Sequence, residues 1–478
     1  MKKAYKIFLP LLCLIIVATA CEEGITTNPA DRLSFSADTL RFDTLFTEQT
    51  SPTITLKVYN PNSKAILINS VRLEQNRFFF LNIDGEADPL NMRDIRIEAK
   101  DSMYVFLKAN FSKHSTNDAV LLTDRLLFNY NDQLSAIEIE AVSQNVRRLT
   151  NQTYEGDVTF DNTMPYLVYD TLLILGNLTI TEGAKFYMHE HSVIFCLGNV
   201  VMNGTVGSPI VFRGDRTDNL FTDVPYDYVS GNWLGIYILQ EADAPARAHT
   251  INCANIHSAA VGLFCQSPQA AERSRLTLTN SVIYNMSAYG VTLQNIDAEL
   301  INNEISNCSM YCLYLSGGKH TIIHNTIASY FNSKEAPAMH YVGHEDVAAV
   351  YINDVSKNVA TTETYMHNNV IAGSRQNNLV LATPLLNRYV GSFTHNYLIN
   401  DTLPYPQFSD NIYGTTGDTV FVNTVFRSET HEYYDFRLDS LSPARGIADT
   451  AIARLYQTDR LGNDRLLNGV ADAGCYAQ

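Results

Sequence analysis

The sequence predicts an all-β protein in which a β-sandwich precedes a right-handed parallel β-helix. Three observations predict this fold class. One four-residue sequence motif recurs six times in the second half of the chain, and a second strand pattern follows most copies at a nearly fixed distance. In the first third of the chain, apolar and polar residues alternate. With 478 residues, 46% of them hydrophobic, the chain can bury a large core and hold more than one domain.

The repeated motif starts with Cys, Asn or His and ends three residues later on an aliphatic residue. The copies end at Ile256, Ile283, Ile305, Ile327, Val370 and Leu398, which are 27, 22, 22, 43 and 28 residues apart. We interpret the 43-residue step as close to two 22-residue steps. A repeat this short cannot bury its own apolar face, so the copies must stack as a solenoid. β-Branched neighbours and the absence of helical spacing indicate strands and turns.

A second strand is expected in each coil, with two inward residues on either side of one outward residue. The segments are 262–265, 290–293, 312–315, 350–352 and 379–381. Four of these five segments end 9 to 11 residues after the aliphatic residue of the first strand. The segment 350–352 ends 25 residues after it. About 15 extra residues must therefore protrude from that coil, and we assign them to a loop at about 331–347.

Polar columns accompany the repeat. Asn303, Asn325, Asn368 and Asn396 are expected to stack at one corner and satisfy backbone groups there. His324, His367 and His395 share the preceding position. Because His324 and His367 are expected about two coils apart, we interpret this column as a polar ladder at a turn and predict no metal site.

The N-terminus predicts export. A basic start precedes an apolar run from Ile7 to Ala18 that is too short for a transmembrane helix. Ala18-Thr-Ala-Cys21 resembles the lipobox of bacterial lipoproteins, which implies cleavage before Cys21, lipidation of Cys21 and anchoring to a membrane. The resemblance implies an outer-membrane lipoprotein, periplasmic or surface-exposed. The alternative is an ordinary signal peptide followed by a chance cysteine.

Two further patterns are similar to those of exported Bacteroidota proteins. Glu22-Glu23 resembles a surface-export signal. Eight Asp-Ser/Thr-aliphatic triplets resemble an O-glycosylation sequon, although Asp-Thr pairs are also common in turns. The triplets start at Asp38, Asp43, Asp101, Asp170, Asp401, Asp418, Asp439 and Asp449.

Residues from about 30 to 148 alternate between apolar and polar side chains, as Ile54, Leu56 and Val58 show before the turn at 60–62. Several such short runs predict an antiparallel sandwich. The order of segments 56–62, 79–80 and 100–107 resembles the immunoglobulin-like modules of bacterial surface proteins. The resemblance implies a spacer between the lipid anchor and the β-helix.

The β-helix itself has a specific resemblance. Segments 178–183, 204–214 and 232–237 resemble the opening coils of pectin-lyase-like right-handed β-helix proteins, and segments 435–439, 442–444 and 472–476 resemble their terminal segment. These similarities cover residues 165 to 478. Such scaffolds host lyases, hydrolases, epimerases and non-enzymatic adhesins, so the fold alone does not define an activity.

Charge and cysteine content restrict the partners. The chain has 34 basic and 50 acidic residues and a net charge of −16, which argues against a nucleic-acid partner. The charge also repels uronate-rich polysaccharides unless a cation such as calcium bridges them, and no cofactor is predicted. The cysteines lack zinc spacing, and burial is the favoured interpretation, with a Cys308–Cys312 bridge as the alternative.

The outward positions of the second strand contain the candidate site. One row comprises Phe264, Thr292, Tyr314, Tyr351 and Val380, and the next comprises Gln266, Gln294, Ser316, Asn353 and Ala382. Neither row supplies the base and cation of a lyase or the two carboxylates of a glycosidase. We predict a ligand site formed by Tyr314, Tyr351, Asn353 and Asp354 with His340 and His344 of the 331–347 loop.

Within that site, Asp354 is the sheet carboxylate able to act as a base or hold a cation; no catalytic residue is assigned. The stretch 215–227 is expected to be a solvated loop, with a carbohydrate-facing loop or a calcium site as alternatives.

Three functional hypotheses follow. The first is a membrane-anchored β-helix surface protein that binds a glycan or a partner protein without catalysis. The second is a polysaccharide lyase or glycoside hydrolase with its site near the 331–347 loop, and the third is a structural stalk. The expected organisation is a signal peptide (1–20), a linker (21–29), an immunoglobulin-like sandwich (30–148), the β-helix (149–430) and a C-terminal cap (431–478).

Overall fold

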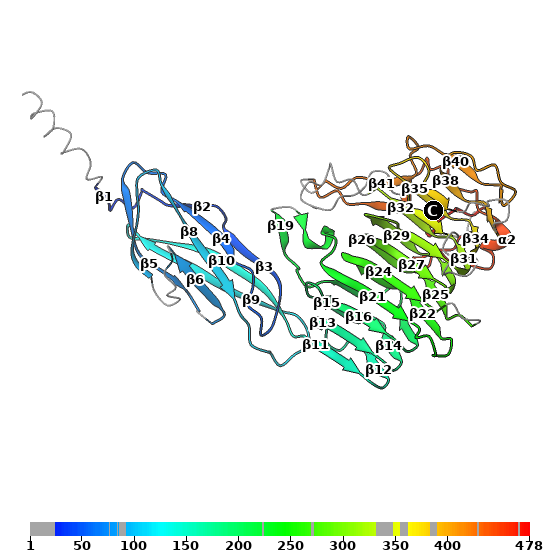
Figure 1. Ribbon diagram of the computed structural model, residues 1–478. Coiled ribbons are helices and arrows are strands. Elements are labelled where there is room, and N and C mark those ends of the chain that lie inside the picture. Colours follow the sequence, from blue (N-terminus) through cyan, green and yellow to red (C-terminus); the bar gives the residue numbers. More distant parts are fainter. Residues whose placement is uncertain are drawn as a thin grey trace, which may run out of the picture. The chain divides into compact units, whose positions relative to one another are not determined.

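The computed structural model describes residues 24–75, 77–83, 85, 92–221, 224–268, 272–330, 348–353, 362–382, 390–427, 430–466 and 469–478. These residues form two compact units, Met1–Asn145 and Val146–Gln478. Almost all regular structure in them is β-strand (Figure 1). Within this part of the chain, no helix combines the length and apolar character needed to cross a membrane. The predicted lipidation residue Cys21 lies outside the described residues.

The first unit is a β-sandwich of two sheets. The six-stranded sheet runs β1-β5-β9-β10-β3 with β7 added on β5, and the four-stranded sheet runs β2-β4-β8-β6. The strands of the larger sheet are β1 (Ile25–Thr26), β3 (Thr39–Phe46), β5 (Ala65–Leu73), β7 (Met92–Ile97), β9 (Val120–Tyr130) and β10 (Gln133–Gln144). Those of the smaller sheet are β2 (Ser34–Phe35), β4 (Ile54–Tyr59), β6 (Phe79–Ile83) and β8 (Ser102–Ala109).

Alternation along each strand explains this core. In β4, Leu56 and Val58 are fully buried, whereas Tyr59 is exposed. Successive side chains of a strand point to opposite faces, so every second residue enters the space between the sheets. Asn60 then fixes the turn after β4, because its buried amide nitrogen donates to the carbonyl oxygens of Lys64, Ile97 and Glu98 at 2.8 to 3.1 Å.

The second unit is a parallel β-helix with three faces (Figure 1). An 18-stranded parallel sheet bends into two of them, since its pairings connect alternate strands into two series, and a ten-stranded parallel sheet forms the third. β11 (Arg147–Tyr154) and β13 (Tyr166–Ile174) open the coils; β13 pairs with β15 along its first half and with β16 along its second half. Each later coil therefore adds one short strand to each face.

The strands of each face follow in chain order. The first face comprises β15 (Lys185–Met188), β18 (Ile210–Gly214), β23 (Ala254–His257), β26 (Val282–Met286), β29 (Glu304–Cys308), β32 (Thr326–Ser329), β35 (Val370–Gly373), β38 (Tyr397–Ile399) and β40 (Ile412–Gly414). The second face comprises β16 (Val193–Cys196), β21 (Trp233–Leu239), β24 (Ala259–Gln266), β27 (Tyr289–Gln294), β30 (Leu313–Ser316), β33 (Val350–Asn353) and β36 (Leu379–Ala382). The third face comprises β12 (Val158–Phe160), β14 (Leu178–Thr181), β17 (Val200–Asn203), β22 (Ala248–Asn252), β25 (Arg275–Thr279), β28 (Asp297–Ile301), β31 (Gly318–Ile323), β34 (Thr362–His367), β37 (Val390–Thr394) and β39 (Phe408–Ser409).

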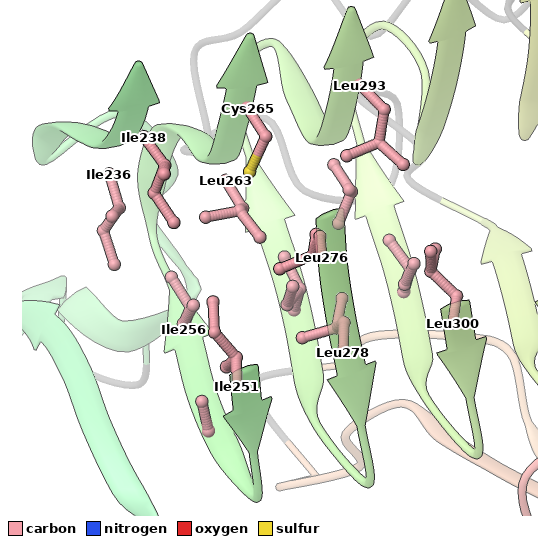
Figure 2. Close-up of a cluster of buried hydrophobic side chains, with 14 of the residues drawn as sticks. Ile236, Ile238, Ile251, Ile256, Leu263, Cys265, Leu276, Leu278, Leu293 and Leu300 are labelled. Carbon is pink, nitrogen blue, oxygen red and sulfur yellow. The ribbon is translucent and has the colours of Figure 1, made fainter. Parts of the chain in front are cut away.

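Inward aliphatic side chains from the three faces meet in one continuous core. Figure 2 shows Ile256 of the first face, Leu263 and Cys265 of the second face, and Leu276 and Leu278 of the third face converging there. Cys265 is fully buried as a free thiol, in the role of a small apolar side chain. Cys308 and Cys312 are also free thiols, so the alternative of a bridge between them is wrong.

The register corrects one step of the repeat. Thr326 pairs with Val370 and Ile327 pairs with Ile371, so strands β32 and β35 belong to adjacent coils. The 43-residue step is therefore one enlarged coil rather than two coils, and its aliphatic residue is Ile371. His324 and His367 are likewise not two coils apart, since the backbone nitrogen of His324 donates to the carbonyl of His367 at 3.1 Å.

The same shift of one residue corrects the asparagine ladder. The ladder consists of Asn303, Asn325, Asn369 and Asn396. From Asn325 onward, each side-chain oxygen accepts from the backbone nitrogen of the preceding member at 2.8 to 2.9 Å and from its side-chain nitrogen at 2.9 to 3.1 Å. Asn368, which we had predicted as a member, has a left-handed φ of 60° beside the ladder. Its side-chain oxygen instead accepts from the backbone nitrogen of Asp449 at 2.8 Å. Two consecutive asparagines in this coil made the two registers look alike in the sequence.

The C-terminal segment, described at 420–427, 430–466 and 469–478, covers the outer side of the first face from β29 to β38. Its elements are β41 (Phe421–Asn423), β42 (Asp435–Leu438) and the single-turn helix α2 (Thr450–Ala453). Phe421 and Phe436 pack on Ala328 and Ala372 of the first face. The backbone nitrogen of Cys475 donates to the Thr326 hydroxyl at 3.1 Å. The outer side of this face is thus a second buried layer.

Candidate functional site

The outer side of the second face presents a row of aromatic residues. Strand pairing places Phe264, Thr292, Tyr314, Tyr351 and Val380 side by side on consecutive strands. The row follows from the period of two along each strand, which turns the middle residue of each motif outward.

Four tyrosines around this row form what we call the tyrosine surface: Tyr289, Tyr311, Tyr314 and Tyr351. The rings of Tyr314 and Tyr351 stack with centroids 5.6 Å apart and an interplanar angle of 6°. Tyr311 lies 4.7 Å from Tyr351, and Tyr289 lies 5.8 Å from Tyr314. All four side chains are half-buried, so they keep part of each ring accessible.

Our sequence interpretation missed Tyr289 and Tyr311, although a signal for them exists. Each precedes the outward position of its coil, Thr292 or Tyr314, by three residues, and the two are one 22-residue step apart. Both lie where the chain enters the second face, just before the second-strand segment of their coil, 290–293 or 312–315.

Amide groups border the tyrosine surface. The side-chain nitrogen of Asn353 donates to the Tyr314 hydroxyl at 3.0 Å, so the structure brings Tyr314, Tyr351 and Asn353 together. In the same row as Asn353, the side-chain nitrogen of Gln266 donates to the oxygen of Gln294 at 3.3 Å. The other predicted members, Asp354, His340 and His344, lie outside the described residues.

The tyrosine hydroxyls are neutral donors. Burial raises the pKa of Tyr289, Tyr311 and Tyr351 above the ordinary value, and neighbouring tyrosines add to the effect. These phenols therefore stay protonated at neutral pH and can donate hydrogen bonds, but are poor bases. Thr292 differs from our expectation of an exposed residue: it is only 3% exposed, being much shorter than its neighbours in the row.

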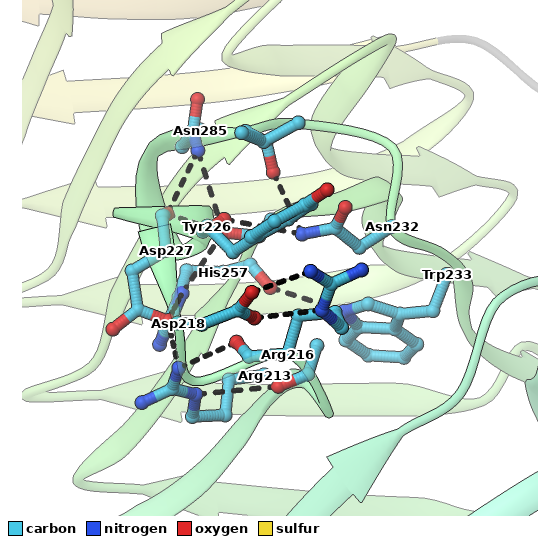
Figure 3. A network of polar contacts seen from close by, with 12 residues as sticks. Arg213, Arg216, Asp218, Tyr226, Asp227, Asn232, Trp233, His257 and Asn285 are labelled. Carbon is cyan, nitrogen blue, oxygen red and sulfur yellow. Dashed lines mark hydrogen bonds and ion pairs between the residues drawn. The ribbon is translucent and has the colours of Figure 1, made fainter. Parts of the chain in front are cut away.

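A second polar cluster lies around the stretch 215–227, which we had expected to be a solvated loop. The Arg213 guanidinium pairs with the Asp227 carboxylate at 2.7 Å, and Arg216 pairs with Asp218 (Figure 3). The amide nitrogen of Asn285 donates to the Asp227 carbonyl at 3.0 Å. Asp218 and Asp227 thus have partners, and the bonds of Asp227 to Arg213 and Asn285 connect the described part of the loop to the first face.

His257 belongs to this cluster but is not an accessible base. It is 4% exposed, and its ring stacks on Tyr284 at 4.8 Å. Burial, reinforced by the positive charge of Arg213, lowers the pKa of His257 to about 3, against a weaker opposing effect of Asp227. Its imidazole is therefore neutral at neutral pH and has a structural role under Tyr284. Among the described residues, no group of three His, Cys, Asp or Glu side chains could hold a metal ion.

Comparisons with known proteins add little. No family model and no curated protein match the chain. One similar solved structure is that of the Escherichia coli chaperone DraB, which shares 14% identity over 24% of this chain and 55% of that chain, with a TM-score of 0.17. The PapD-like domain 7 of human CEP192 shares 8% identity over 26% of this chain and 92% of that chain, with a TM-score of 0.17. A family 123 glycoside hydrolase from Clostridium perfringens shares 8% over 27% of this chain and 30% of that chain, with a TM-score of 0.18.

The chain thus spans about half the length of DraB and less than a third of the hydrolase. At these scores the likenesses carry no argument about function. The fold and the candidate site together define a parallel β-helix protein with an aromatic, amide-bordered surface on one face.

Proposed function

We propose that this protein is an exported lipoprotein whose tyrosine surface binds a glycan chain without cleaving it. The observation that carries the proposal is the set of four half-exposed tyrosine rings, from Tyr289 to Tyr351, on a flat parallel sheet. Aromatic faces offer an apolar contact for the C–H side of a sugar ring, and their hydroxyls remain available for hydrogen bonds. Asn353 and Gln294 at the border can bind further hydroxyls.

Charge favours a neutral glycan over an acidic one. The two outward rows contain no basic residue, and the whole chain has a net charge of −16. Arg375 is the basic residue that acts on Tyr311 of this surface, so an acidic polysaccharide would be opposed by the net charge of the chain rather than by the surface itself, whereas a neutral one would not be opposed. A general base is also missing from these two rows, which favours binding over cleavage.

The anchoring part of the proposal depends on the sequence. Lipidation at Cys21 would hold the protein on the outer membrane, with the sandwich as an immunoglobulin-like spacer, as in the Bacteroidota lipoproteins that the chain resembles. Cys21→Ser removes the sulfur to which the lipid would attach, so we expect an unprocessed or soluble protein. Membrane fractionation tests this, and an unchanged membrane fraction for the variant would reject lipidation.

A panel of neutral and acidic polysaccharides tests the binding function. Purified protein would be assayed for retention by each polysaccharide and for release of new reducing ends. We expect retention by a neutral polysaccharide without product, and about tenfold weaker binding for Tyr351→Ala because one stacking ring is lost.

Tyr104→Ala is the matched control, since Tyr104 is a 49% exposed tyrosine of the sandwich. Unchanged binding by Tyr351→Ala would remove the tyrosine surface from the function. Product release that depends on Asp354 would instead establish a polysaccharide-degrading enzyme.

A further inference from the structure

A cavity of about 190 Å³ lies on the first face, away from the tyrosine surface. Strands β26 and β29 form its floor, and the C-terminal segment and the loop before β21 form its walls. Its lining residues are Tyr228, Val282, Tyr284, Asn285, Glu304, Ser306, Asn307, Tyr434 and Phe436. The cavity is thus built from three segments that are far apart in the sequence.

Four of its nine lining residues are aromatic. Tyr228 stacks on Tyr433 of the C-terminal segment at 4.8 Å and 8°, and Tyr434 stacks on Phe436 at 5.8 Å and 12°. Tyr284 rests on the buried ring of His257. Each of these lining rings therefore packs against another ring.

The floor is polar. Glu304 is 9% exposed, and its carboxylate accepts hydrogen bonds from the Ser306 hydroxyl at 3.0 Å and from the Tyr476 hydroxyl. Asn307 uses its side-chain oxygen to accept from the backbone nitrogen of Tyr330 at 3.0 Å. A carboxylate and two side-chain amides therefore line the cavity beside the aromatic rings.

The polar network in Figure 3 holds one wall in place. Asp227, the residue before Tyr228, pairs with Arg213, and its carbonyl accepts from Asn285 of the cavity lining. Asn232 donates to the carbonyls of Tyr226 and Val229 on either side of Tyr228, at 3.2 and 3.0 Å. Ordering the wall in advance lowers the entropy cost of binding, which is typical of recognition sites.

We infer that this cavity is a second sugar site, which binds one neutral pyranose ring such as the end residue of a glycan chain. At about 30 Å³ per water, the cavity has room for roughly six waters, and it is smaller than sites for drug-sized ligands. The aromatic walls suit the faces of a sugar ring, while Glu304, Asn285 and Asn307 suit its hydroxyls. The Glu304 carboxylate would repel a uronate.

This inference shares only the class of ligand with the proposed function, because the two sites lie on different faces. Isothermal titration with the methyl glycosides of glucose, galactose and mannose, and with N-acetylglucosamine, tests the cavity directly. We expect at least one of these sugars to bind. Val282→Phe, which fills the cavity with a ring, should abolish that binding.

Glu304→Gln should weaken the same binding about tenfold, because a hydrogen bond to a charged acceptor is lost. Tyr351→Ala on the other face should leave monosaccharide binding unchanged. The midpoint of urea unfolding is measured for each variant, and Val282→Phe, which changes a partly exposed side chain, keeps the test valid if Glu304→Gln fails to fold.

The inference is overturned if no sugar of the set binds, if Val282→Phe binds as well as the wild type, or if Tyr351→Ala alone abolishes binding. The last result would place monosaccharide binding on the tyrosine surface. Choline and glucuronate serve as competing probes. Tighter binding of choline than of every sugar would show a cation site formed by aromatic rings, and would also overturn the proposal.

Discussion

The first and second faces of the β-helix are built from adjacent strands of the same coils, yet their outer sides differ. On the first face, the outward residues Ala328 and Ala372 are small and fully buried under the C-terminal segment. On the second face, the outward residues Tyr314 and Tyr351 are large and half-exposed. The inward rows of both faces are aliphatic and enter the same core.

The inward and outward rows of side chains therefore have separate structural roles. The inward rows stabilise the coils, whichever face they belong to. Where the outward residues are small, as at Ala328 and Ala372, another part of the chain packs closely on them. At Tyr314 and Tyr351 the amphipathic rings tolerate water and remain available to a ligand. Substitutions at matched positions on the two faces test whether their outer sides differ in this way.

The largest effect is expected at the asparagine ladder, at the corner where the third face meets the first face. Asn325→Leu leaves the carbonyls of Leu300 and Ile323 and the backbone nitrogen of Asn303 without their buried partner. We expect a loss of about 3 kcal/mol or more in the free energy of unfolding, since each buried unsatisfied group costs about 1 to 3 kcal/mol.

Equilibrium unfolding in urea measures this loss, and Asn203→Leu at an exposed strand end is the control, expected within about 0.5 kcal/mol. A loss below about 1 kcal/mol for Asn325→Leu would mean that the ladder does not hold the corner.

A matched pair of substitutions tests the two outer sides directly. Ala372 of β35 and Val380 of β36 belong to the same coil but to different faces. Ala372→Tyr should destabilise the protein by about 3 kcal/mol, because the ring has no space under the C-terminal segment. Val380→Tyr should stay within about 0.5 kcal/mol, because it extends the tyrosine surface into solvent. Unfolding curves and proteolysis of the C-terminal segment are the measurements; equal costs would remove the distinction between the faces.

The first face should also be acid-sensitive through His257. Its folded-state pKa of about 3 is below the unfolded value of about 6.5, so the unfolded chain binds the proton more tightly. The stability linked to the neutral form of His257 is present above pH 6.5 and is lost progressively as the pH falls towards 3. At pH 5 the loss in unfolding free energy amounts to about 2 kcal/mol. His257→Phe keeps a ring against Tyr284 but cannot titrate. Unfolding curves at pH 7.5 and 5 should therefore show a smaller pH effect in the variant; an identical pH effect would contradict the buried neutral histidine.

The smallest effect is expected from Tyr314→Phe on the tyrosine surface. The change removes the hydroxyl that accepts from Asn353 at 3.0 Å but keeps the ring that stacks on Tyr351. We expect about 1 kcal/mol or less in unfolding free energy and a modest loss of glycan affinity. Calorimetric titration with the bound polysaccharide separates stacking from hydrogen bonding. A loss as large as that of Tyr314→Ala would assign the binding to the hydroxyl rather than the ring.

The features that each coil repeats could be predicted from the sequence. The enlarged coil and the contacts outside the repeat could not. The parallel β-helix and the outward row from Phe264 to Val380 follow from spacing alone, because each coil repeats the same inward contacts. The register was wrong by one residue at Asn368, because the enlarged coil separates two copies and a second asparagine imitates the pattern. Local patterns also gave no sign that the C-terminal segment covers the first face, or that Asp227 pairs with Arg213, since these contacts join distant segments.

Hydroxyl-radical footprinting can show whether a glycan lies on the tyrosine surface. Oxidation of each tyrosine would be measured by mass spectrometry with and without the polysaccharide that the panel identifies. We expect protection of Tyr289, Tyr311 and Tyr351 in the presence of the polysaccharide, and unchanged oxidation of Tyr104 in the sandwich. Unchanged oxidation of the three tyrosines while the polysaccharide is bound would contradict glycan binding at this surface.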